Sequence, residues 1–256
     1  VVEAAKTASV VCLQEVTARS AAWLQEKLGD RFDVITPVRC GAAWGTEGHG
    51  VAVAVSKRAF CVERFECVAL SSLQQRQLLA VRLRERGGTR TLLVGTTHLE
   101  SGVEHAAERA GQLQDACRRL EDSGVDAALL AGDLNLRGEE GREVLDGWGD
   151  AWEVADEPVE SAVTWSPAQG LGPAYRFDRV LARKTQAAVD GSGAEFLSTL
   201  VLQDRSLSLR PLAAGTDHRG VQCAFELRES RATLLRRRRR RMGPPLRAGV
   251  RGRVGN

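Results

Sequence analysis

The strongest constraint on this chain is an apolar run that ends in a short polar turn. Residues 127–131 are Ala-Ala-Leu-Leu-Ala and are followed directly by Gly132-Asp133-Leu134-Asn135. An unbroken apolar run ended by a turn predicts a buried strand that carries Asp133 and Asn135 at its carboxyl end. A carboxylate that accepts a proton and a carboxamide that orients water suit phosphoester hydrolysis. Because Asp and Asn are also common turn and cap residues, this motif alone does not decide between a catalytic and a structural role.

Polar clusters also end three other apolar runs. They are Leu13-Gln14-Glu15-Val16, Thr97-His98-Leu99-Glu100-Ser101 and Thr216-Asp217-His218-Arg219-Gly220. A carboxylate at a strand end usually faces solvent, and a histidine there is usually a hydrogen-bonded structural residue. Together, however, acidic, amide and imidazole groups at the ends of several strands predict one shared site.

The hydrophobic pattern predicts a single α/β domain with a mixed sheet and no internal boundary. Strands are expected over residues 9–14, 32–36, 50–56, 61–70, 77–84, 91–97, 127–131, 175–182 and 220–227. Helices are expected from Thr17 or Ser20 to Gly29, over 105–120 and, as a short piece, over 139–145. The segment with Trp148 and Trp152 is expected to be a loop.

The net charge of +3 conceals two oppositely charged parts. Residues 228–256 hold eleven arginines against one glutamate, so the preceding 227 residues carry a net charge of −7. We expect a folded domain over 1–228 and a disordered arginine-rich tail over 229–256, with six consecutive arginines at 236–241. The tail is a nuclear-localisation or nucleic-acid-binding arm, or a solvated segment without function. A nucleic-acid site on the acidic body must be a local patch.

The cysteines and the hydropathy restrict the cellular setting. Six cysteines are scattered without a Cys-X-X-Cys pair, and several lie inside apolar runs, which favours reduced structural thiols over disulfides or a zinc site. No secretory signal opens the chain, and no run approaches the ~18–20 apolar residues of a membrane span. We expect a nuclear protein, with the cytoplasm as the alternative, that is monomeric and not membrane-bound.

The order of these clusters, with Arg176-Phe177-Asp178-Arg179 between the last two, resembles the endonuclease/exonuclease/phosphatase superfamily. The resemblance covers residues ~8–227. It implies an α/β fold like that of DNase I: a four-layer α/β/β/α sandwich of two mixed sheets with helices on the outer faces.

A narrower resemblance is to the tyrosyl-DNA phosphodiesterases of that superfamily, which remove topoisomerase tyrosine adducts from DNA 5′ ends. Its motifs are Glu100-Ser101, His105-Ala106-Ala107-Glu108-Arg109, Asn135-Leu136-Arg137 and Thr164-Trp165. The implied partner is a DNA 5′ end that carries a tyrosyl or peptide adduct. The alternatives are another endonuclease or phosphatase of the same fold, and a catalytically dead nucleic-acid-binding fragment.

The resemblance also implies a role for each site residue. Glu15 is the expected ligand of one Mg²⁺, with Mn²⁺ as the alternative ion. Asp133 is expected to deprotonate the attacking water, and Asn135 to hold that water or a phosphate oxygen. His218 and His98 are expected to contact the phosphate, with Asp178 orienting His218 and Asp217 supporting the metal's water shell. The expected DNA contacts are Arg137, Trp165 and Ser101.

Two departures from the superfamily pattern bear on activity. Nothing before Glu15 supplies the Asn motif of the superfamily's first strand, which predicts an exposed sheet edge and, as one alternative, an inactive fragment. Val103 stands where the subfamily carries an arginine, and Glu104 follows it. The uncharged Val103 and the added carboxylate of Glu104 should weaken the hold on an anionic substrate.

Overall fold

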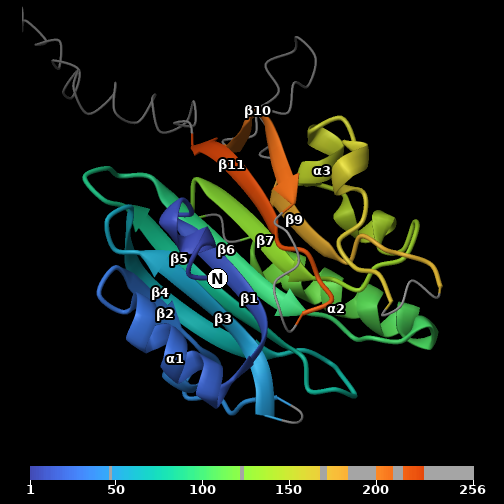
Figure 1. The fold of residues 1–256 in the computed structure, drawn as a ribbon, viewed down its shortest axis with the longest axis horizontal. Helices are drawn as coiled ribbons and strands as arrows, with labels where there is room; N and C mark the ends of the chain where they lie inside the picture. Colours follow the sequence, from blue (N-terminus) through green and yellow to red (C-terminus); the bar gives the residue numbers. More distant parts are fainter. Residues whose placement is uncertain (46–47, 122–123, 168–171, 184–199, 210–215, 228–256) are drawn as a thin grey trace, which may run out of the picture.

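A computed structural model describes residues 1–45, 48–121, 124–167, 172–183, 200–209 and 216–227. Its helices and strands form a layered α/β domain (Figure 1). The predicted tail over 229–256, with its arginine run, lies outside the described residues.

The smaller of the two main sheets has three antiparallel strands in the order β1-β3-β2. These are β1 (Val10–Thr17), β2 (Phe32–Ile35) and β3 (His49–Ser56). Within the described part of the chain β1 pairs only with β3, so it is an edge strand of the small sheet. A bulge interrupts this pairing between Leu13 and Val16.

The larger sheet has six strands in the order β4-β5-β6-β7-β9-β8 and is mixed. Its strands are β4 (Phe60–Ala69), β5 (Gln77–Glu85), β6 (Thr91–His98), β7 (Ala127–Asp133), β8 (Trp148–Asp150) and β9 (Asp178–Arg183). β6 and β7 run parallel, and the other neighbours run antiparallel. A separate antiparallel pair consists of β10 (Leu200–Leu209) and β11 (Val221–Leu227).

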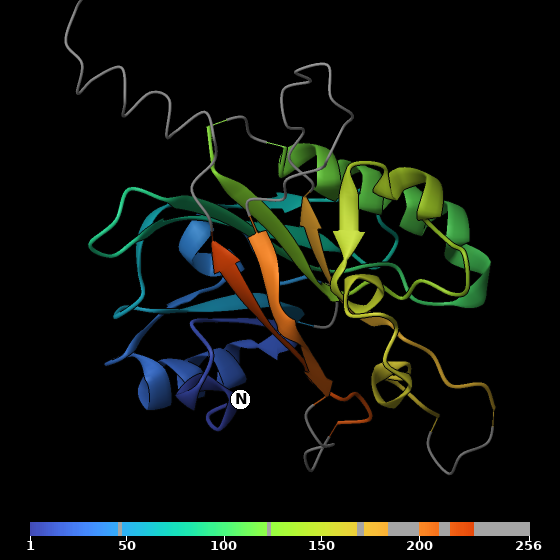
Figure 2. The ribbon, with the colours of Figure 1, turned by 90° about the horizontal axis from the view of Figure 1, so that it is seen from above.

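Two helices cover the main sheets from opposite sides (Figure 2). α1 (Ala18–Leu28) begins at a capping box in which Thr17 and Ser20 satisfy each other's backbone N–H groups. α2 (Ala106–Arg119) follows β6 and leads into β7, which is the crossover that a parallel strand pair requires. The short α3 (Ala151–Val154) is capped by Asp150.

Three apolar clusters fill the spaces between these layers. Leu24, Leu28 and Phe32 belong to the cluster between α1 and the small sheet. Val53 and Val81 belong to the cluster between the two sheets, and α2 packs on the large sheet through a third cluster. The layers are therefore helix, sheet, sheet and helix, in the predicted order. Both sheets were predicted to be mixed, whereas among the described residues the three-stranded sheet is antiparallel and only the six-stranded sheet contains a parallel pair.

Two local predictions were wrong, and one strand was not predicted. The segment of Trp148 and Trp152 is the strand β8 followed by α3, because Trp148 is buried in the α2 core and pairs with β9. The predicted helix over 139–145 is only a 3-10 turn at Arg142–Leu145. The strand β10 was not predicted at all.

All six cysteines are free. Within the part of the chain that the structure describes, no helix has the length and apolar character needed to cross a bilayer.

Candidate active site

The parallel pair β6–β7 brings the first two predicted groups together at its carboxyl end. His98 and Asp133 are register partners, and His98 Nε2 lies 3.3 Å from Asp133 Oδ2. Gly132 allows this approach, since a Cβ atom there would lie 2.0 Å from the carbonyl oxygen of Thr97. Both side chains are almost fully buried.

Asn135 is held beside Asp133 by two hydrogen bonds. Its backbone N–H donates to Asp133 Oδ1 at 3.0 Å, and its side-chain Nδ2 donates to the carbonyl of Leu99 at 3.1 Å. The backbone of Asn135 has a φ of 51°, a left-handed conformation that Asn tolerates better than most residues. The turn thus fixes both the carboxylate and the carboxamide.

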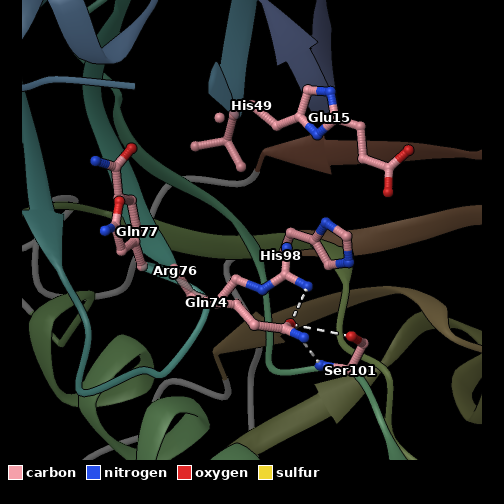
Figure 3. Close-up of a pocket in the computed structure, with 10 residues that line it drawn as sticks. Glu15, His49, Gln74, Arg76, Gln77, His98 and Ser101 are labelled. Carbon is pink, nitrogen blue, oxygen red and sulfur yellow. Dashed lines mark hydrogen bonds between the residues drawn. The ribbon is translucent and has the colours of Figure 1, made fainter. Parts of the chain in front are cut away.

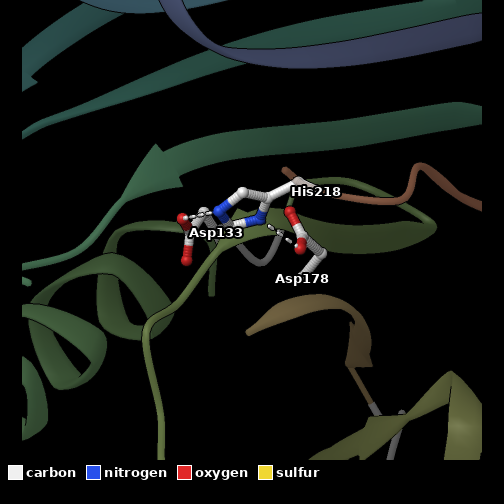
Figure 4. Close-up of side chains that lie close together, drawn as sticks. All are labelled: Asp133, Asp178 and His218. Atoms are coloured by element: carbon white, nitrogen blue, oxygen red, sulfur yellow. Dashed lines mark hydrogen bonds and ion pairs between the residues drawn. The ribbon is translucent and has the colours of Figure 1, made fainter. Parts of the chain in front are cut away.

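His218 completes a cluster with Asp133 and Asp178 (Figure 4). Antiparallel pairing of β7 with β9 places Asp178 opposite Asp133. His218 Nδ1 lies 2.8 Å from Asp178 Oδ2, and its Nε2 lies 3.7 Å from Asp133 Oδ2. The imidazole therefore lies between the two carboxylates, with its Nδ1 facing Asp178 and its Nε2 facing Asp133.

The three ionisable groups have pKa values displaced in different directions. Burial and the charge of Asp178 raise the pKa of Asp133 to about 7, although His218 opposes this. Burial lowers the pKa of His218, but the hydrogen bond and charge of Asp178 outweigh it and raise the value to about 9. Burial and the charge of Arg76 lower the pKa of His98 to about 3. Near neutral pH, His98 is neutral and His218 is cationic.

Glu15 reaches the site from the other sheet. It lies in the bulge of β1, has a φ of 55° and is exposed. The adjacent Gln14 donates to Thr96 Oγ1 at 2.9 Å and so ties β1 to β6 near His98. Bulges and left-handed backbone at non-glycine residues cluster at functional sites, because they aim side chains at a cost in stability.

A pocket of about 240 Å³ separates Glu15 from His98. Figure 3 shows Glu15 and His49 on one side of it and Gln74, His98 and Ser101 on the other. Gln74 Oε1 accepts hydrogen bonds from both the backbone N–H and the hydroxyl of Ser101. His98 is common to this pocket and to the Asp133 cluster, so the two form one continuous site.

The donor groups fit a hard divalent cation. Glu15 offers an exposed carboxylate to the pocket, and Asp133, Asp178 and His218 place ligand atoms within 4.8 Å of one another. Carboxylate oxygens are the ligands that Mg²⁺ prefers in proteins. Since the imidazole of His218 is already engaged by Asp178, Glu15 remains the better candidate ligand.

Arg76 is a site residue that sequence reasoning missed. Its Nη2 donates to Gln74 Oε1 at 2.6 Å, whereas its buried Nε has no hydrogen-bond partner among the described residues. The pKa of Arg76 is lowered, because the effect of burial outweighs the charges of Glu100, Asp133 and Glu15, which raise it. Its sequence setting, Gln-Gln-Arg-Gln, is typical of a solvated loop and contains no signal for a site. His49 also lines the pocket and was missed because its sequence neighbours contain no signal for a site either.

Two of the predicted DNA contacts, Trp165 and Arg137, form an aromatic and cationic wall with Tyr175 and Phe177. Trp165 stacks with Tyr175 at 6.2 Å and contacts Phe177 at 5.3 Å, measured between ring centroids. The guanidinium carbon of Arg137 lies 4.9 Å from the centroid of Phe177. Trp165 is half-buried, so its ring both packs and remains reachable.

The contact that Asp217 makes differs from the one expected for it. Its Oδ2 accepts a hydrogen bond from the indole N–H of Trp165 at 2.7 Å, and its side chain is exposed. Trp165 also forms a β-bridge with His218. Asp217 therefore braces the aromatic wall beside His218, and its support of a metal's water shell stays a prediction.

Comparison with known proteins identifies the family of this chain. Residues 2–218 match the Endonuclease/Exonuclease/phosphatase family. Human tyrosyl-DNA phosphodiesterase 2 is 29% identical over 235 residues, which cover 85% of this chain and 59% of that protein. The 5′-tyrosyl-DNA phosphodiesterase of Caenorhabditis elegans is 34% identical over 139 residues, covering 50% of this chain and 38% of that protein. The chain thus spans little more than half the length of the human relative.

Solved structures share the fold. The structure of D. rerio TDP2 complexed with single strand DNA product has a TM-score of 0.69 at 22% identity and covers 87% of this chain and 88% of that one. Truncated Caenorhabditis elegans TDP2 has a TM-score of 0.63 at 27% identity and covers 85% and 84%. The family match over residues 2–218 includes the site residues from Glu15 to His218. The chain belongs to the endonuclease/exonuclease/phosphatase family.

Proposed function

We propose that this protein is a Mg²⁺-dependent phosphodiesterase that hydrolyses 5′-phosphotyrosyl bonds at DNA ends. The observation that carries the proposal is the placement of Asp133 between His98 and His218, with His218 braced by Asp178. This arrangement holds a base and a cation at one point, as attack of water on a phosphodiester requires.

Asp133 is the proposed base. Its pKa is raised to about 7, close to the value at which a carboxylate both loses its proton near neutral pH and accepts one from water. Asn135, fixed beside it by the Leu99 carbonyl, is the proposed orienting group for that water or for a phosphate oxygen. Water adds to phosphorus, its proton passes to Asp133, and the tyrosyl oxygen departs.

Positive charge from the chain itself stabilises the anionic transition state. His218, with a pKa raised to about 9, faces Asp133 as an imidazolium. Arg76 supplies a second cation beside His98, which is neutral and suited to donating a hydrogen bond to a phosphate oxygen. A phenolic leaving group, with a pKa near ~10, departs with less protonation than an alkoxide needs.

Glu15 would hold the Mg²⁺, and Mn²⁺ is the alternative ion. The ion, when bound, supplies Lewis-acid neutralisation of phosphate charge. The residues present fit it, since Glu15 has an exposed carboxylate and lines the same pocket as His98.

The choice of DNA ends as substrate rests on the aromatic wall and on the named relatives. Trp165 and Tyr175 offer faces for stacking on bases, and Arg137 adds charge beside them. Ser101 is the proposed polar contact at the pocket wall. A tyrosyl or peptide adduct is then the leaving group, and a nuclear location and a monomeric state are the corresponding proposals.

A substrate panel tests the proposal. Purified protein with Mg²⁺ should release tyrosine from a 5′-phosphotyrosyl oligonucleotide faster than it cleaves abasic-site DNA, a poly(A) tail or inositol phosphates. Asp133→Asn should lower the rate about 10³-fold, whereas the exposed Asp30→Asn should leave it unchanged. Preference for another member of the panel would assign a different substrate on the same fold. DNA binding without any cleavage would favour the binding-only alternative.

A further inference from the structure

Arg109, near the amino end of α2, is a fully buried charge that lies outside the Asp133 cluster. It has no exposed surface, and its Nε and Nη2 donate to the two carboxylate oxygens of Glu140, each at 2.9 Å. Such a bidentate pair fixes both the distance and the plane of its two partners. A buried ion pair of this kind is better evidence for a precise arrangement than for stability.

The other edge of the guanidinium holds the segment that follows β6. Arg109 Nη1 donates to the carbonyl oxygen of Glu100 at 3.2 Å and also to that of Gly102. Ser101, which lines the pocket, lies between these two residues. Gly102 has a φ of +94°, which strains any other residue, so the direction of its carbonyl depends on glycine.

Glu140 in turn holds the segment that carries Arg137. Its Oε2 accepts a hydrogen bond from the backbone N–H of Arg137 at 3.1 Å, and its own N–H donates to the Arg137 carbonyl at 3.0 Å. The side-chain Nη1 of Arg137 donates to the carbonyls of Asn135 at 3.1 Å and Gly102 at 3.3 Å. The carbonyl oxygen of Gly102 therefore accepts hydrogen bonds from both Arg109 and Arg137.

We propose that Arg109 and Glu140 are positioning residues that lock the Ser101–Gly102 and Arg137 segments against each other as one rigid surface for the DNA arm of the substrate. The proposal rests on the proposed function. The pair acts through Arg137 and Ser101, which contact the nucleotides, whereas Asp133 and His98 are held by strand pairing. Loss of the pair should weaken the hold on DNA and leave the hydrolytic step intact.

Two conservative variants and one matched control separate these effects. Glu140→Gln keeps the shape and removes the charge, and Arg109→Lys keeps the charge and removes the planar fork. The control is Glu139→Gln, because Glu139 is the neighbouring residue and forms an exposed pair with Arg142. The substrates are a 5′-phosphotyrosyl oligonucleotide and the p-nitrophenyl ester of thymidine 5′-monophosphate, which has a single nucleotide.

Glu140→Gln and Arg109→Lys should raise KM for the oligonucleotide about tenfold with kcat within about twofold, and should leave kcat/KM for the single nucleotide unchanged. Amide hydrogen exchange should accelerate over residues 100–103 and 136–141 in both variants and not in Glu139→Gln. Equal losses on both substrates, or unchanged exchange in these segments, would overturn the proposal. If the unsubstituted protein cleaves neither substrate, the proposed function fails, while hydrogen exchange still decides whether the pair locks the two segments.

Discussion

His218 and Asp178 form the shortest contact within the cluster of Asp133, Asp178 and His218, with 2.8 Å between Nδ1 of the imidazole and Oδ2 of the carboxylate. The two residues are 40 positions apart and come from different elements. The bond orients the ring so that its other nitrogen faces Asp133 at 3.7 Å. It also keeps the ring protonated, so that one contact controls both the geometry and the charge of His218.

The pH dependence of activity follows from this pair. Activity should rise as Asp133 loses its proton near its pKa of about 7 and fall as His218 loses its proton near its pKa of about 9. Asp178→Asn removes the charge that raises both pKa values, so both limbs of the pH profile of kcat/KM should move to lower pH. An alkaline limb that stays in place in the variant would assign it to another group.

Metal dependence should depend on Glu15. Glu15→Gln removes one charge from an exposed carboxylate that lines the pocket, so the Mg²⁺ concentration for half-maximal activity should increase about tenfold or more. EDTA should abolish the activity of the unsubstituted protein, and added Mg²⁺ should restore it. Glu26→Gln on the outer helix α1 is the control, since Glu26 is exposed and pairs with Lys27. Identical Mg²⁺ titrations for Glu15→Gln and the control would exclude Glu15 as the ligand.

The aromatic wall should contribute to DNA affinity. Trp165→Ala removes a stacking face and the indole donor to Asp217, and should raise KM for a tyrosyl oligonucleotide about tenfold. Trp165→Phe keeps the face and loses the donor, so it should have a smaller effect. Trp23→Ala, at a 46% exposed position on α1, should leave this KM unchanged. A thermal melt distinguishes lost affinity from unfolding, and an unchanged KM in Trp165→Ala would leave the ring only a packing role.

Gly132 should be essential for stability at the site. An alanine Cβ would lie 2.0 Å from a backbone oxygen of Thr97, so Gly132→Ala should lower the free energy of unfolding by about 3 kcal/mol. The matched control, Gly111→Ala, should have the opposite sign, because Gly111 lies within α2 with open space around it. Its gain should be about 0.8 kcal/mol. Urea denaturation of both variants measures this contrast, and an equally stable Gly132→Ala would contradict the close strand contact.

Local sequence patterns predicted most elements of the sandwich because their periodicities are strong. The apolar run at 127–131 became β7, and the helical period after His105 became α2. β8 escaped because three residues are too few to show an alternation, and its burial depends on packing against Leu181 and α2. Among the described residues β10 pairs with β11 alone, so its strand state depends on that partner.

Local sequence features were enough to identify the chemical groups of the site and their order along the chain: Glu15, His98, Asp133, Asn135 and His218 stand close to the ends of predicted strands, and Asp178 lies within the predicted strand over 175–182. Tertiary structure alone decided their distances, because strand register and the packing of two sheets join residues up to two hundred positions apart. It also decided what no local pattern encodes, namely that the half-buried Arg76 lines the pocket, that Asp217 accepts a hydrogen bond from Trp165, and that Arg109 holds two loops together.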